Sequence, residues 1–115
     1  MSGHRGSGHF FRQRFTAVLL IPLTVWFVYN VARYTGADHS TVAAFLSAPM
    51  NAGMLLALIL IGVYHMVLGI QVVIEDYVEE GGTRSLLMGL NTVFGLLAAA
   101  ACGLAVAKLA NWIQI

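Results

Sequence analysis

Charged side chains divide this sequence into three long uncharged runs, and these runs constrain the fold more than any other feature. Residues 15–32 form an uncharged run of 18 residues, and residues 85–107 form another of 23. Between them, residues 40–74 form a run of 35 whose only ionisable group near neutral pH is His65. A membrane-spanning helix needs about 20 predominantly apolar residues. The first and third runs therefore predict one spanning helix each.

The middle run is too long for one straight span, and Pro49 divides it. Proline is disfavoured inside a helix but suits its first turn, so we expect a helix to begin near Pro49. Residues 41–46 are then a short amphipathic or interfacial stretch. Pro22 lies within the first span, where it either kinks the helix or is simply tolerated. The pair Gly81-Gly82 predicts a sharp reversal, so the second and third spans should be antiparallel neighbours.

The predicted fold is all-α: an integral membrane bundle of three transmembrane helices at about 14–34, 50–77 and 85–108. Residues 1–13 are then an N-terminal tail, and residues 14–115 form the membrane domain. Of the 115 residues, 59% are hydrophobic and 10% are charged, against about 25% charged in an ordinary soluble domain. The mean hydropathy is +0.82 and the net charge is +1. This balance excludes a soluble globular protein, a disordered segment and a nucleic-acid binder. One cysteine, Cys102, excludes an internal disulfide.

The distribution of Lys and Arg predicts the orientation of the chain, because cytoplasmic loops carry an excess of these residues. One side of the predicted membrane domain carries four basic residues: Arg5, Arg12, Arg14 and Arg84. The other side carries two, Arg33 and Lys108. We therefore expect the N-terminus to be cytoplasmic and the C-terminus to lie outside.

His65 is the only histidine inside a predicted span, and an ionisable residue there indicates function by default. It is either hydrogen-bonded to a neighbouring helix or a metal ligand, most plausibly to haem iron. Gly62 and Gly69 share the face of His65 and leave a flat slot that suits a porphyrin or close helix contact. A second histidine ligand would have to come from a partner, since His9 lies too near the membrane surface to reach.

A second group of candidate residues lies at the predicted cytoplasmic end of the second span. Asp76 follows His65 by eleven residues, close to three helical turns, and Tyr77 comes next. These are either an interfacial helix end or a headgroup site, with a phenol donating to a carbonyl beside a carboxylate. Arg12 and Arg14 enter the first span at the same membrane face as positive-inside anchors, and one could pair with a haem propionate. Thr16 is expected to bond its own helix backbone.

The segment His65-Met-Val-Leu-Gly69-Ile-Gln71-Val-Val-Ile-Glu75-Asp76-Tyr77-Val resembles the second span of the small cytochrome b membrane anchors of succinate dehydrogenase. That family carries a haem-ligating histidine, a glycine four residues on, and an Asp-Tyr pair eleven and twelve residues on. The start of the first span, Arg14-Phe-Thr16-Ala17, is similar to the family's Arg-x-Thr-Ala sequence. Length and three-span topology match along nearly the whole chain.

The resemblance implies a role in succinate:ubiquinone oxidoreductase of the respiratory chain and the tricarboxylic acid cycle. By this resemblance, His65 is one axial ligand of a b-type haem shared with a second anchor subunit, and Arg14 lies near the propionates. Tyr77 would hydrogen-bond a ubiquinone carbonyl, with Asp76 beside that site. FAD and iron–sulfur clusters would belong only to partner subunits, a flavoprotein and an iron–sulfur protein. The location would be the bacterial inner membrane, or alternatively the mitochondrial inner membrane.

Three other hypotheses stay open at the level of the sequence. The chain could anchor a fumarate reductase, or it could be a structural or assembly subunit without a cofactor. A proton-conducting bundle that uses His65, Glu75 and Asp76 as a relay is a weaker alternative, because about 16 Å separates the histidine from the acids. Succinate oxidation is not expected from this chain itself, which has no nucleotide-binding or iron–sulfur cysteine pattern.

Overall fold

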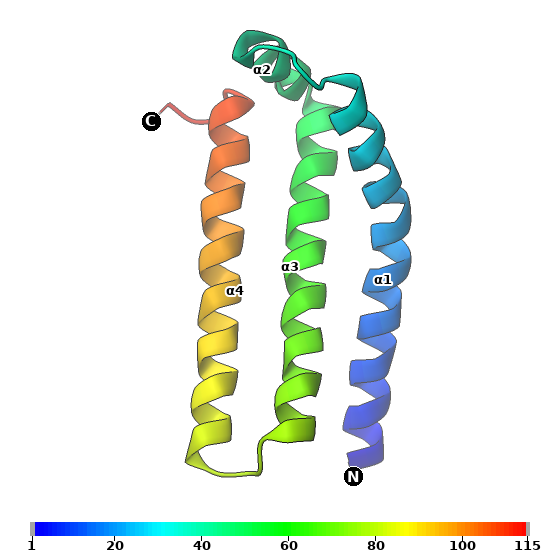
Figure 1. Cartoon of the computed structure of the whole chain (residues 1–115), viewed down its shortest axis with the longest axis vertical. Helices are drawn as coiled ribbons and strands as arrows, with labels where there is room; N and C mark the ends of the chain where they lie inside the picture. Colours follow the sequence, from blue (N-terminus) through cyan, green and yellow to red (C-terminus); the bar gives the residue numbers. More distant parts are fainter. Residues whose placement is uncertain (1, 115) are drawn as a thin grey trace.

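The computed structural model of this chain describes residues 2–114, with side chains from residue 8 onward, and contains four helices. The helices are α1 (Ser2–Arg33), α2 (His39–Ser47), α3 (Pro49–Tyr77) and α4 (Gly82–Leu109) (Figure 1). Three of them contain segments long and apolar enough to cross a membrane: Gly8–Arg33, Pro49–Tyr77 and Gly82–Leu109. The predicted all-α fold with three spans is therefore confirmed.

The three long helices lie side by side in a row, with α3 in the middle (Figure 1). Both α1 and α4 pack against α3, and within the described residues α1 and α4 make no contact with each other. The start of α1 and the α3–α4 turn lie at one end of the row, and α2 and the C-terminus lie at the other. This arrangement places the two groups of Lys and Arg residues at opposite ends, as the sequence predicted.

Local sequence signals set most of the helix boundaries. Pro49 occupies the first turn of α3, as predicted, and Gly81 precedes α4 with a φ of 148° that favours glycine. Helix α1 continues unbroken through Pro22 and begins at Ser2, well before the predicted start of the span at residue 14. The residues of the predicted tail, apart from Met1, which lies outside the described residues, are thus the first turns of α1.

Asp38 caps the N-terminus of α2, the short helix that covers the predicted interfacial stretch. Its carboxylate accepts a hydrogen bond from the Thr41 backbone N–H at 2.9 Å and one from the Ser40 hydroxyl at 3.1 Å. Hydrogen bonding from Thr41, side chain first and then backbone, lowers the pKa of Asp38 below its ordinary value, and Ser40 adds to the effect. The charged carboxylate is therefore the form that caps α2.

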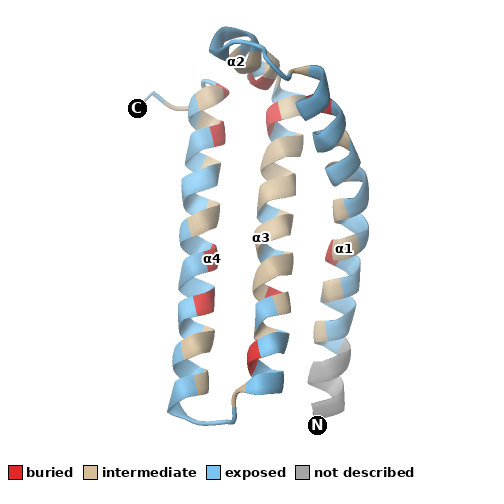
Figure 2. Ribbon diagram, in the orientation of Figure 1, coloured by how far each residue is buried: buried red, intermediate tan, exposed pale blue. Residues whose placement is uncertain are grey.

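Few side chains are buried within the row, and most of the ribbon in Figure 2 is exposed or intermediate. A small core lies near the α2 end, where Ala52 of α3 packs with Val106 and Ala110 at the end of α4. Farther along, buried Gly95 of α4 lets the helix approach Val67 of α3, so closely that an added Cβ would lie 2.5 Å from Val67 Cγ2. Small residues at helix contacts are how membrane helices associate, since lipid removes the hydrophobic driving force between them.

Candidate functional site

His65 is held by a hydrogen bond from α3 to α1. Its Nδ1 lies 2.8 Å from the Thr16 hydroxyl oxygen, and Thr16 is buried between the two helices. The same hydroxyl donates to the backbone carbonyls of Arg12, at 2.8 Å, and Gln13, at 3.0 Å, as predicted for a threonine within a helix. The bond to His65 uses one ring nitrogen and leaves the other, Nε2, available.

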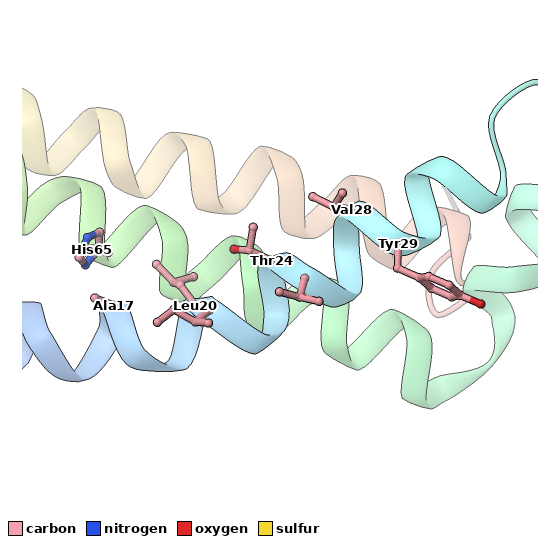
Figure 3. A pocket seen from close by; sticks show the side chains of 8 residues that line it. Ala17, Leu20, Thr24, Val28, Tyr29 and His65 are labelled. Atoms are coloured by element: carbon pink, nitrogen blue, oxygen red, sulfur yellow. The ribbon is translucent and has the colours of Figure 1, made fainter.

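An apolar groove of about 710 Å³ runs along α1 from the level of His65 (Figure 3). Seven residues of α1 and one of α3 line it: Ala17, Leu20, Ile21, Thr24, Val25, Val28, Tyr29 and His65. In Figure 3 the imidazole of His65 lies across from Ala17, and Tyr29 lies at the far end of the groove. The only titratable side chains of the lining are therefore one imidazole and one phenol, at opposite ends of an apolar wall.

The two glycines predicted to flank the ligand have different surroundings. A Cβ added at Gly69 would lie 3.3 Å from Gln13 Nε2, so α1 covers this glycine. A Cβ added at Gly62 would meet nothing within 4 Å. Gly69 thus lets α1 approach α3 beside His65, whereas Gly62 leaves open space on the opposite side of the imidazole.

Arg14 lies on the face of α1 that forms the groove. Residues 14, 17, 21, 25 and 28 follow one another at helical spacing, so Arg14 precedes the groove by one turn. Its guanidinium carbon lies 4.8 Å from the centroid of the Phe10 ring, one turn earlier on the same face. Arg12 lies two residues from Arg14, about 200° around the helix, and therefore faces elsewhere.

Asp76 and Tyr77 lie at the end of α3, where the helix meets the α3–α4 turn. Both are exposed, and Tyr77 retains 84% of its accessible surface. Arg84 fastens the turn, because its guanidinium donates to the Glu75 carbonyl at 3.0 Å and pairs with Glu80 at 3.5 Å. The structure thus presents the predicted quinone-binding pair on the surface and separates it from His65 by about 16–18 Å along α3.

Three polar contacts between helices have partners that were not predicted from the sequence, although a hydrogen bond from His65 to a neighbouring helix was one of its two interpretations. Besides the Thr16–His65 bond, His9 Nε2 donates to the Leu68 carbonyl at 3.2 Å, and Asn91 Nδ2 donates to the Val67 carbonyl at 3.0 Å. His9 thus packs α1 against α3, and the carbonyl that it bonds lies one turn of α3 beyond His65. The available signal was spacing: His9, Gln13 and Thr16 recur every three or four residues and form a polar stripe on one face of the helix.

Comparison with known proteins decides the family. A family model described as "Succinate dehydrogenase/Fumarate reductase transmembrane subunit" matches residues 1–105. The chain belongs to this family. Within the described residues, no group of three or more His, Cys, Asp or Glu side chains could hold a metal ion.

Relatives across most of the chain carry names that agree with this family. The chain is 33% identical over 96 residues to the succinate dehydrogenase hydrophobic membrane anchor subunit of Rickettsia bellii, covering 84% of this chain and 77% of the relative. It is 31% identical over 108 residues to the subunit of that name in Paracoccus denitrificans, covering 94% and 83%. The succinate dehydrogenase membrane anchor subunit of Reclinomonas americana is 38% identical over 82 residues, covering 69% and 68%. No solved structure matches the chain.

Proposed function

We propose that this chain is the hydrophobic membrane anchor of a succinate:ubiquinone oxidoreductase, and that it shares a b-type haem with a second anchor subunit. The observation that carries the proposal is His65, fixed by Thr16 at one end of an apolar groove in a chain of this family. A ligating histidine characteristically uses its second ring nitrogen for such a hydrogen bond.

The residues around His65 fit a haem. Nε2 of His65 would hold the iron, the apolar wall of α1 would pack against the porphyrin, and Arg14 would pair with a propionate. Open space at Gly62 leaves room beside the imidazole. When bound, the haem supplies a one-electron redox centre. The second axial ligand would come from the other anchor subunit, because His9 is engaged with the Leu68 carbonyl.

The end of α3 would contribute to the site where ubiquinone is reduced. The exposed phenol of Tyr77 can donate a hydrogen bond to a quinone carbonyl, and the adjacent Asp76 can hold or pass on a proton. Both residues lie at the end of the row that carries the larger number of basic residues, which we assign to the cytoplasmic face. The flavoprotein and iron–sulfur subunits, with FAD and the iron–sulfur clusters, would bind at that face of a bacterial inner membrane or a mitochondrial inner membrane.

Succinate oxidation is favoured over fumarate reduction by the relatives. The family description includes both enzymes, whereas the relatives from Rickettsia bellii, Paracoccus denitrificans and Reclinomonas americana are all named as succinate dehydrogenase subunits. The alternative, a structural or assembly subunit without a cofactor, would instead tolerate the replacement of His65 by alanine.

A reduced-minus-oxidised absorption spectrum of the gently solubilised complex tests the proposal. The native complex should show a b-type haem signal that is lost or shifted in His65→Ala. His39→Ala is the matched control, because His39 is an exposed residue at the start of α2 and should leave the spectrum unchanged. A native complex without haem, or an unchanged spectrum in His65→Ala, would contradict the haem assignment.

A further inference from the structure

The hydrogen bond between Thr16 and His65 could run in either direction, and the neighbouring carbonyls favour one of them. The hydroxyl of Thr16 carries one proton and lies within 2.8 Å of the Arg12 carbonyl oxygen and 3.0 Å of the Gln13 carbonyl oxygen. A carbonyl oxygen can only accept, so the threonine proton points toward its own helix. The lone pairs of the hydroxyl oxygen are then left to accept a hydrogen bond from His65 Nδ1 at 2.8 Å.

This direction selects one of the two neutral forms of the imidazole. If Nδ1 carries the proton and donates it to Thr16, Nε2 carries the lone pair and can bind a metal ion. The opposite form would place the proton on Nε2 and block that nitrogen. Thr16 is only 6% exposed, so water does not compete with His65 for the hydroxyl oxygen of Thr16.

We propose that Thr16 is a positioning residue: it holds His65 in the Nδ1-protonated form and directs Nε2 for coordination to haem iron. The inference rests on the proposed function for the identity of the bound group. A hydrogen bond donated from the far nitrogen also makes the imidazole a more basic ligand, which stabilises the oxidised iron and lowers the midpoint potential of the haem.

Two variants at position 16, compared in the purified complex, separate the effect of the Thr16 hydroxyl group from the effect of side-chain packing. Thr16→Val keeps the branched shape without the hydroxyl, and Thr16→Ser keeps the hydroxyl. We expect Thr16→Val to weaken haem retention by about 10- to 100-fold, the usual effect of removing an outer-shell partner of a metal ligand, and to raise the midpoint potential. Thr16→Ser should restore both values toward those of the native complex.

The outcomes distinguish this inference from the proposed function. Native haem content and potential in Thr16→Val, together with loss of haem in His65→Ala, would overturn the role of Thr16 alone. Haem content that does not depend on His65 would overturn the proposed function.

If the Thr16→Val complex fails to assemble, a measurement on the chain without haem still tests the inference. Nitrogen-15 NMR of the full chain in lipid bilayers, with its four histidines labelled, reports which ring nitrogen of His65 is protonated. The His65 signals are identified because they are absent from the spectrum of His65→Ala. Protonation at Nδ1 supports the inference, and protonation at Nε2 overturns it.

Discussion

At the scale of single residues, Gly95 is the glycine of the described chain at which an added Cβ would come nearest to another side chain. An added Cβ at Gly95 would lie 2.5 Å from Val67 Cγ2 and 3.6 Å from Val63 Cγ1. Valine is confined to essentially one rotamer in a helix, so Val67 cannot turn aside. We expect Gly95→Ala to destabilise the pairing of α3 with α4 by about 1–3 kcal/mol, measured as a lower midpoint of thermal unfolding of the complex.

Gly103→Ala on the same helix is the control for Gly95→Ala. Its Cβ would lie 3.7 Å from Leu56 Cδ1, an ordinary van der Waals contact, so this change gives the gain in helix propensity without overlap. Val67→Ala combined with Gly95→Ala should recover part of the lost stability. Equal midpoints for the two alanine variants would refute the close contact.

Tyr77 offers a second test at the residue scale, through the rate of quinone reduction. Tyr77→Phe removes one hydroxyl from an exposed position, so we expect the fold and the haem spectrum to persist. Loss of one hydrogen bond of about 1 kcal/mol lowers quinone reductase activity by about fivefold. Tyr64→Phe, at another exposed tyrosine of α3, should leave the activity unchanged. Native activity in Tyr77→Phe would remove Tyr77 from the quinone site.

The sequence was sufficient to predict candidate residues but not their partners. His65 was identifiable because it interrupts an apolar run, and its spacing to Gly62, Gly69 and Asp76 follows from helical geometry alone. Thr16 was predicted to bond its own backbone, as it does, but its further bond to His65 depends on how α1 lies against α3. That register is set by contacts such as Gln13 against Gly69, which no local pattern specifies.

At the scale of helices, apolar length and proline position were enough to predict three spans and the start of α3. The start of α1 could not be predicted, because its Gly- and Ser-rich first residues have weak helix propensity. Helix α2 was predicted only as an interfacial stretch. Its start depends on Asp38, whose side chain caps the helix by bonding Thr41.

The capped start of α2 should depend on pH. The pKa of Asp38 is lower in the folded chain than its unfolded value of about 3.9. The contribution of Asp38 to the stability of the first turn of α2 is therefore fully present above the unfolded pKa and is lost as the pH falls through the folded pKa. We therefore expect amide exchange at Thr41 and Val42, corrected for the intrinsic rate, to accelerate as the pH falls below about 4. Asp38→Asn, which caps without titrating, should abolish this dependence, and an identical pH profile in Asp38→Asn would contradict the assignment.

At the scale of the whole molecule, the helices form a row, and the outer faces of α1 and α4 are left for lipid or a partner helix to cover. Helices α1 and α4 contact only α3 among the long helices of the described part of the chain, and their outer faces carry exposed Phe, Leu, Ile and Val. Composition predicted three helices, but it could not distinguish a row from a closed bundle, because lipid and a partner helix satisfy apolar faces equally well. The groove beside His65 is lined almost entirely by α1, and in the proposed function a second subunit completes the haem site there.

The last prediction is the direction in which the row crosses the membrane. Cysteine labelling can measure it, because the chain has a single native cysteine to replace. In a Cys102→Ser background, Ala37→Cys lies in the exposed turn before α2, and Glu79→Cys lies in the exposed turn before α4. A membrane-impermeant maleimide added to intact spheroplasts should label position 37 and should label position 79 only after the membrane is opened. The four basic residues at one end against two at the other give this orientation. The reverse labelling would place Asp76 and Tyr77 outside, opposite the face proposed for the flavoprotein and iron–sulfur subunits, and would contradict the proposed role of Tyr77 in quinone reduction.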